Sequence, residues 1–177
     1  MSFFNSILKF FVGDKTKKDI KSILPIVEEI KSFESEISKL NNDELREQTQ
    51  NFKSEIELSI NEIKSKIKEL KEAVDKTNDF DEKEELYTQI DQCEEESYKI
   101  TEDTLNKILP KAFAVVKETA KRFYNNKEII VKATAFDREI SANKEYVQLN
   151  QDNAVWKNKW DAAGTEIIWE MVHYDVQ

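Results

Sequence analysis

The sequence has very few of the residues that interrupt or end helices. Its 177 residues include two glycines and two prolines, whereas sandwiches, barrels and compact α/β folds need many turn formers. Charged residues make up 36% of the chain and apolar residues 39%. These proportions predict long, rarely interrupted helices, in a chain whose length fits one domain with an elaboration.

Residues that bind metals or act as nucleophiles are also scarce. The single cysteine, Cys93, excludes an internal disulfide and a cysteine-built zinc site, and its place in a helical stretch favours a structural thiol. His173 is the only histidine, so a metal site or a nucleophile–histidine pair would lack its other members. The motifs G-x-x-x-x-G-K-[ST], G-x-G-x-x-G and G-x-S-x-G do not occur. The 177 residues therefore contain no catalytic constellation and no predicted metal site.

Negative charge dominates, but it is concentrated in one stretch. The net charge is −9, and Asp79–Asp103 alone holds eleven acids against Lys83 and Lys99. Without a stripe of clustered cations, nucleic acid is not an expected partner. The acidic run is interpreted as the solvated outer face of a helix, with a docking surface as the alternative.

The first residues form an aromatic, amphipathic stretch beside a group of lysines. They lack the basic start of a signal peptide, and no segment has the roughly 20 apolar residues needed to cross a bilayer, so we expect a cytoplasmic protein. The stripe can pack on its own bundle or on a second copy, or it can lie on an anionic membrane surface. Its members are Phe3, Phe4, Ile7, Leu8 and Phe11, and the lysines that follow are Lys15, Lys17 and Lys18.

Helical periodicity continues through the next hundred residues. A helix is predicted from about residue 17 to 39, kinked or started late at Pro25, so residues 1–41 form amphipathic and bundle helices. Asn41 and Glu44 have the spacing of a capping box at the start of the next helix. Residues 42–109 are predicted to form a long antiparallel helical hairpin. Its seam would join Ile56, Ile60, Ile63, Ile67, Leu70 and Val74 to Leu86, Ile90, Cys93 and Ile100.

The pattern changes in the last third of the chain. Pro110 is predicted to end the hairpin, and residues 110–126 to form a separate compact helix. Residues 127–170 are rich in β-formers, and "NQDN" between "EYVQL" and "AVWKN" predicts a hairpin. The tryptophans at 156, 160 and 169 are expected at the core and rim of this patch. The predicted fold class is mainly α with a small antiparallel β patch, an α+β chain.

The sequence ends on an apolar, β-prone run, "IIWEMVHYDVQ". Such residues favour a half-buried pleated surface, whereas chain ends are usually loose and solvated. We therefore expect the run to belong to a larger protein and to leave apolar surface exposed. Self-association through residues 167–177 or through the N-terminal stripe would follow.

Three phrases, in their order, resemble one known family. "LNNDELREQTQNFK", "LPKAFAVVKETAKR" and the terminal "MVHYDVQ" are similar to phrases at the N-terminus of SecA, the ATPase motors of bacterial preprotein export. Relative to the shorter common form of that family, segments at about 57–104 and 127–170 look like insertions, which resemble those of the Bacteroidetes-type lineage. The resemblance makes residues 110–126 a helix of the first nucleotide-binding domain and residues 171–177 a truncated Q-motif segment.

The resemblance implies functions that the composition does not show. The parent protein would be an ATP-hydrolysing translocase that uses ATP and Mg²⁺, whereas this chain, without a phosphate-binding loop, would be non-catalytic and would hold no cofactor. Gln177 would read the adenine edge with its amide, with Met171 and Tyr174 as apolar neighbours. The partners implied are the Sec translocation channel, preprotein and acidic phospholipid at the inner face of the cell membrane. A homodimer contact near the N-terminus is also implied.

Two other functions remain open from the residues themselves. The chain can be a self-contained helical interaction module that uses the hairpin as a docking arm. It can also be a peripheral membrane anchor that uses the N-terminal stripe.

Overall fold

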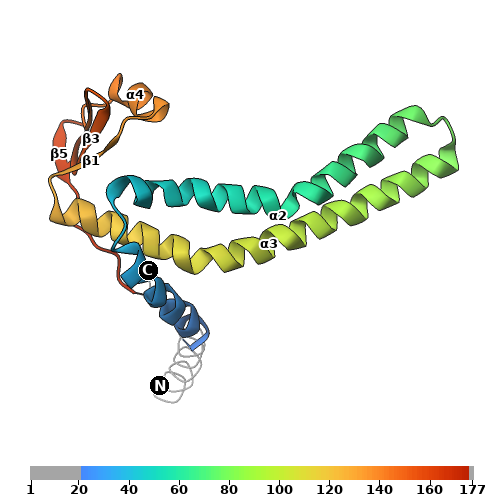
Figure 1. The fold of residues 1–177 in the computed structure, drawn as a ribbon, viewed down its shortest axis with the longest axis horizontal. Coiled ribbons are helices and arrows are strands. Elements are labelled where there is room, and N and C mark those ends of the chain that lie inside the picture. Colours follow the sequence, from blue (N-terminus) through green and yellow to red (C-terminus); the bar gives the residue numbers. More distant parts are fainter. Residues whose placement is uncertain (1–20, 176–177) are drawn as a thin grey trace, which may run out of the picture. The chain divides into compact units, whose positions relative to one another are not determined.

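A computed structural model describes residues 21–175, which divide into two compact units (Figure 1). One unit contains the residues through Leu45 and those from Phe113 onward, and the other is Arg46–Ala112. Helices dominate and the strands form two small antiparallel sheets. The predicted fold class, mainly α with a small antiparallel β patch, is confirmed.

The first helix, α1, covers residues 21–37 of the described chain and contains Pro25. Helical periodicity predicts an apolar face that includes Ile23, Leu24, Val27 and Ile37, and of these Val27 and Ile37 are buried. Ile23 and Leu24 on the same predicted face are exposed. The apolar face is therefore only partly covered by the described residues.

The predicted capping box between α1 and α2 is present. The backbone N–H of Glu44 donates to Asn41 Oδ1 at 3.0 Å, and the backbone N–H of Asn41 donates to Glu44 Oε2 at 2.8 Å. Helix α2, Asn42–Lys76, begins directly after this cap. The reciprocal bonds satisfy donors that a helix start leaves unpaired, which fixes where α2 begins.

Within Arg46–Ala112, α2 and α3 lie antiparallel and pack along the predicted seam (Figure 1). Ile60, Ile63 and Cys93 form its buried centre, and Lys71 Nζ pairs with Glu94 Oε1 at 3.0 Å. Cys93 is thus the structural thiol that was expected. Ile67, Leu70 and Ile100 pack against this centre.

Helix α3 spans Phe80–Asn125 without a break, so the prediction that Pro110 ends a helix is wrong. A proline inside a helix removes one hydrogen bond and costs about 3 kcal/mol. Ile108 before it and Val115 after it are both buried, and burying such side chains stabilises by about 1.5–3 kcal/mol each. Packing on both sides of Pro110 offsets its local cost.

The β-rich region contains a three-stranded sheet in the order β1-β3-β2. Its strands are β1 (Glu128–Lys132), β2 (Val147–Asn150) and β3 (Asn153–Lys157). The predicted hairpin is correct, because Asn150 pairs with Asn153 across a two-residue loop. Val131, Val147 and Ala154 form the buried centre of the sheet.

The sequence reasoning missed a short helix, α4, at Ala135–Ser141. Thr134 caps it and exchanges hydrogen bonds with Asp137, whose side chain is 0% exposed. Trp156 Nε1 donates to Asp137 Oδ1 at 2.9 Å, and Trp156 packs against the sheet centre as expected. The Thr-x-x-Asp spacing of a capping box was the available signal for this helix.

A second hairpin, β4 (Lys159–Ala162) and β5 (Thr165–Ile168), follows β3. Of this hairpin, the sequence indicated only the β-prone run that begins at Ile167. Ala163 and Gly164 both have positive φ, 55° and 84°, as a tight two-residue turn requires. At its base, Asn158 donates its backbone N–H to Lys127 O at 2.9 Å and accepts from the Trp169 N–H at 2.7 Å. This places the start of the C-terminal segment, residues 169–175.

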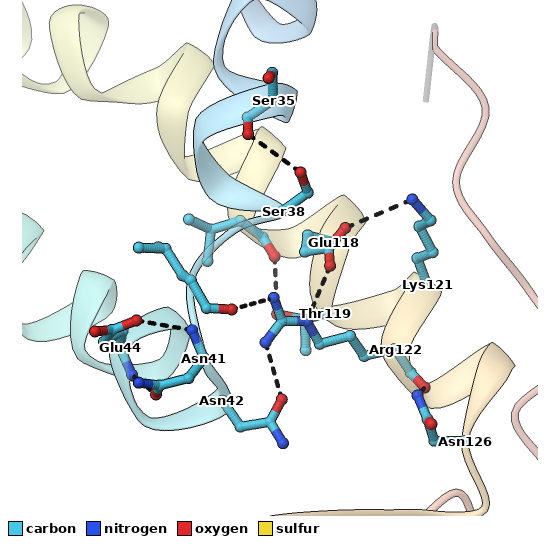
Figure 2. Close-up of polar contacts among 12 residues, drawn as sticks. Ser35, Ser38, Asn41, Asn42, Glu44, Glu118, Thr119, Lys121, Arg122 and Asn126 are labelled. Atoms are coloured by element: carbon cyan, nitrogen blue, oxygen red, sulfur yellow. Dashed lines mark hydrogen bonds and ion pairs between the residues drawn. The ribbon is translucent and has the colours of Figure 1, made fainter.

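Arg122 on α3 joins the loop between α1 and α2 to its own helix (Figure 2). Nη2 donates to Leu40 O at 2.6 Å, Nη1 to Asn42 Oδ1 at 2.9 Å, and Nε to Glu118 Oε1 at 2.9 Å. Asn42 Nδ2 in turn donates to Ile130 O at 3.2 Å. One guanidinium therefore ties together α3, the α1–α2 loop and, through Asn42, strand β1.

Among the described helices, none is both long and apolar enough to span a membrane.

Ile63→Ala is expected to destabilise the hairpin by about 2–5 kcal/mol, because it leaves a cavity in the buried seam. Loss of helical circular dichroism during urea unfolding measures this effect. The matched control is Leu58→Ala on the same helix, where the side chain is 74% exposed and the expected change is within about 0.5 kcal/mol. Equal destabilisation by both variants would show that the seam does not hold the hairpin.

Arg122→Met is expected to destabilise the unit that contains the residues through Leu45 and those from Phe113 onward. The expected loss is about 2–4 kcal/mol, because three acceptors lose a half-buried charged donor. Arg122→Lys should lie between Met and the native residue, since an ammonium cannot reproduce the forked geometry. Tryptophan fluorescence during urea unfolding reports on this unit, because all three tryptophans belong to it. Lys121→Met, at an exposed neighbour, is the control. A Lys variant as stable as the native chain would contradict the role of the fork.

Candidate functional site

A cavity of about 180 Å³ lies between α1, α3 and the C-terminal segment. Its apolar lining comes from Val27 and Ile30 of α1 and from Phe113 and Val116 of α3. Its polar lining comes from Lys31, Glu34, Lys117, His173, Tyr174 and Asp175. The site therefore combines two helices with the segment that carries the predicted nucleotide residues.

Lys117 bridges α1 and the C-terminal segment. Its Nζ donates to Glu34 Oε1 at 2.7 Å and to Asp175 Oδ1 at 2.6 Å. The Lys117 side chain is only 23% exposed, so solvent screens these contacts less than it screens a surface ion pair. Lys31 of α1 completes the group, with its Nζ 3.1 Å from Asp175 Oδ2. Each carboxylate oxygen of Asp175 thus contacts a lysine from a different helix.

The charges in this group support one another. Hydrogen bonds from Lys117 and then Lys31 hold the pKa of the Asp175 carboxyl below its usual value. Asp175 and then Glu34 raise the pKa of Lys117, and Asp175 also raises that of Lys31. The Asp175 carboxyl, whose pKa is lowered, keeps its stabilising charge above about pH 4. The two lysines, whose pKa values are raised, keep theirs below about pH 10. The ion pairs are therefore intact across the neutral range.

The C-terminal segment is tied to the β-rich region at its other end. The Trp169 N–H donates to Asn158 O, and Trp169 Nε1 donates to Met171 O at 2.7 Å. The His173 ring lies beside the Trp169 ring, with centroids 6.5 Å apart. Among the described residues, His173 Nδ1 finds no hydrogen-bond partner although the atom is buried. The backbone is thus fixed near Trp169 and again at Asp175.

The structure brings together only some of the predicted site residues. Tyr174 lines the cavity yet is 76% exposed, and Met171 is 46% exposed and does not line it. Gln177 lies outside the described residues, as do all the residues predicted for membrane contact, Phe3, Phe4, Ile7, Leu8, Phe11, Lys15, Lys17 and Lys18. The expected exposure of apolar side chains near the C-terminus is confirmed by Ile167, Ile168, Met171 and Tyr174.

The sequence reasoning missed the residues that hold the site together. Lys117 lies inside the phrase "LPKAFAVVKETAKR" and Asp175 inside "MVHYDVQ", but neither was singled out. Lys31 and Glu34 lie in α1, where a charge is usually a solvated surface group. Nothing in single-sequence periodicity pairs residues 58 positions apart, as Lys117 and Asp175 are.

The arrangement can hold a segment of backbone in place. Within residues 21–175 no cluster of histidine, cysteine or carboxylate side chains could bind a metal ion. Its chemistry is that of two lysines that fix one carboxylate.

Comparison with known proteins gives the family. The family model described as the SecA DEAD-like domain matches residues 8–177. Protein translocase subunit SecA of Christiangramia forsetii and that of Flavobacterium psychrophilum are each 55% identical to all 177 residues. The SecA subunit of Bacteroides fragilis is 42% identical over 174 residues, 98% of this chain. No solved structure matches the chain.

These matches cover both segments that looked like insertions, since they extend over the whole or nearly the whole chain. The chain spans 16% of the length of each of these relatives. With a family model matched along residues 8–177 and curated relatives at 55% identity, this chain belongs to the SecA family.

Proposed function

We propose that the chain is the N-terminal portion of a SecA motor that couples ATP hydrolysis to preprotein export through the Sec translocation channel. The observation that carries this proposal is the 55% identity, over all 177 residues, to proteins named Protein translocase subunit SecA. The 177 residues lack a phosphate-binding loop motif, so by themselves they do not hydrolyse ATP. Catalysis and the Mg²⁺ site belong to residues that this chain does not contain.

Within this function, the C-terminal segment contacts the adenine of ATP. The amide of Gln177 offers a donor and an acceptor side by side, which matches the edge of adenine. Met171 and Tyr174 supply apolar surface next to the base. Their exposed side chains support this role, because a ligand can reach them from solvent.

The N-terminal stretch binds the inner face of the cell membrane. Its aromatic stripe would enter the headgroup region, and Lys15, Lys17 and Lys18 would attract acidic phospholipid. The Sec channel and preprotein are the protein partners of this function, and a homodimer contact near the N-terminus accompanies it. The protein is thus cytoplasmic and peripheral on the membrane.

In the full-length protein, Gln177→Ala is expected to raise the Kd for ATP about tenfold, because two hydrogen bonds to adenine are lost. It should also reduce discrimination against GTP, since the amide reads the base. Tyr174→Ala should raise the Kd about threefold to tenfold through lost ring contact. Fluorescent-nucleotide titration measures all three quantities.

The control for Tyr174 is Tyr98→Ala, a similarly exposed tyrosine of the hairpin, which should leave the Kd unchanged. The 177-residue chain alone should show no micromolar ATP affinity. Micromolar binding by that chain, or unchanged affinity in the Gln177 variant, would contradict the assignment.

Deletion of residues 1–12 is expected to abolish co-sedimentation of the chain with vesicles that contain acidic phospholipid. Replacing Lys15, Lys17 and Lys18 by Gln should weaken binding about 100-fold, at about 1 kcal/mol per lysine, and added salt should have a similar effect. The matched control replaces three exposed lysines of α2, Lys64, Lys66 and Lys68. Equal loss in the control would show only a dependence on total charge.

A further inference from the structure

Asp175 is held from two sides by lysines of different helices. Lys117 of α3 contacts Oδ1 at 2.6 Å, and Lys31 of α1 contacts Oδ2 at 3.1 Å. Lys117 also contacts Glu34 of α1 at 2.7 Å. We call Lys31, Lys117 and Asp175 the Asp175 clamp.

One member of the clamp, Asp175, lies within the segment proposed to contact adenine. Asp175 directly follows Tyr174 and is two residues before Gln177. On the other side, Trp169 anchors the same segment through Asn158 O and Met171 O. The backbone is thus tied on both sides of Tyr174, while the Tyr174 side chain stays open to solvent. This arrangement fixes the direction of a side chain without occupying its contact surface.

We propose that the Asp175 clamp positions the adenine-contacting segment and couples it to helix α1. This inference rests on the proposed function, because it assigns the regulation of that same nucleotide site. Lys117 is a positioning residue: it acts on the nucleotide through Asp175 and does not touch the base.

The exposure of the group decides which effect to expect. Exposed ion pairs add little to global stability, and the Asp175 side chain is 47% exposed. Loss of the clamp should therefore barely change unfolding. It should instead raise the entropic cost of ordering the segment when nucleotide binds.

The same contacts provide a route between α1 and the nucleotide. Lys31 and Glu34 both belong to α1. Lys31 contacts Asp175 of the C-terminal segment, and Glu34 contacts Lys117 of α3. A displacement of α1 would break contacts to Asp175 and Lys117, which would lower nucleotide affinity. Linkage then requires that bound nucleotide favour the docked position of α1 by the same factor.

The test uses the full-length protein and replaces Lys117 by Met, which is unbranched and only one atom shorter but carries no charge. Lys117→Met should raise the Kd and the KM for ATP about fivefold or more, with kcat within about twofold. Lys117→Arg should restore most of the affinity, and Lys31→Met should have a smaller effect because its contact is longer and more exposed. The effect should be constant from about pH 6 to 9, since the paired groups keep their charges there.

Lys121→Met is the matched control. Lys121 lies one turn further along α3, is more exposed, and pairs only with Glu118 of its own helix at 3.9 Å. It should change neither the Kd nor the Tm. Asp175→Asn supplies a second route to the answer: the double variant with Lys117→Met should be no weaker than the worse single variant, because the two act through one contact.

The outcomes separate the clamp from the proposed function. Normal ATP affinity in Lys117→Met and Asp175→Asn, together with weakened affinity in Gln177→Ala, overturns the clamp and leaves the nucleotide assignment standing. Absence of ATP binding in the native full-length protein overturns both. Additive losses in the double variant, or no rescue by Arg, also overturn the clamp. Slower hydrogen exchange of α1 on ATP addition, lost in Lys117→Met, supports the coupling.

Discussion

The hydrogen bonds of the Arg122 guanidinium are the interaction on which the rest of its unit depends, the unit that contains the residues through Leu45 and those from Phe113 onward. Two of the three hydrogen bonds fix Leu40 of the α1–α2 loop and Asn42 at the start of α2 against α3. The third, to Glu118 one turn away, holds the orientation of the guanidinium. Without this fork, α1 would be joined to α3 by the Lys117–Glu34 ion pair and by apolar contacts, which have little directionality because dispersion and burial are not directional. The fork supplies direction, and α1 therefore presents Lys31 and Glu34 at a defined place.

Helix α3 carries two polar connections close together. Arg122 holds the start of α2 and, through Asn42, strand β1, while Lys117 holds α1 and the C-terminal segment. The two residues are five positions apart on the same helix, so they point to different sides of it. A rigid helix with two such residues transmits position from one neighbour to another, which a loop could not do. The break predicted at Pro110 does not occur, because buried side chains on both sides of Pro110 keep α3 continuous.

Local patterns in the sequence were enough to predict the hairpin seam, the Asn41 cap and the β2–β3 turn, because each depends on residues close in sequence or on a strict repeat. Helix α4 was not predicted, because the periodicity of apolar residues was given more weight than the Thr134–Asp137 capping-box spacing. The Arg122 fork and the Asp175 clamp join residues that are 58 or more positions apart. Such pairings depend on the tertiary fold, and in a chain with 36 acids and 27 basic residues no charge identifies its partner from sequence alone. The exposed Ile23 and Leu24 of α1 likewise show that an apolar face predicts burial only where a neighbour covers it.

A positioning group made of partly exposed ions would suit the proposed role of a segment that responds to nucleotide. A buried apolar anchor would hold residues 169–175 more firmly, but it would have only one arrangement at any ligand concentration. Ion pairs with roughly half-exposed partners have a small net free energy, so they can break and re-form at a cost that ligand binding can supply. The stiffness is placed in α3 and at Arg122, and the adjustable contacts are placed at Asp175. Lys31 belongs to α1, and Leu40 lies in the loop that follows α1. A change at the Asp175 clamp can therefore shift α1 while the Arg122 fork keeps the loop after its C-terminal end in place.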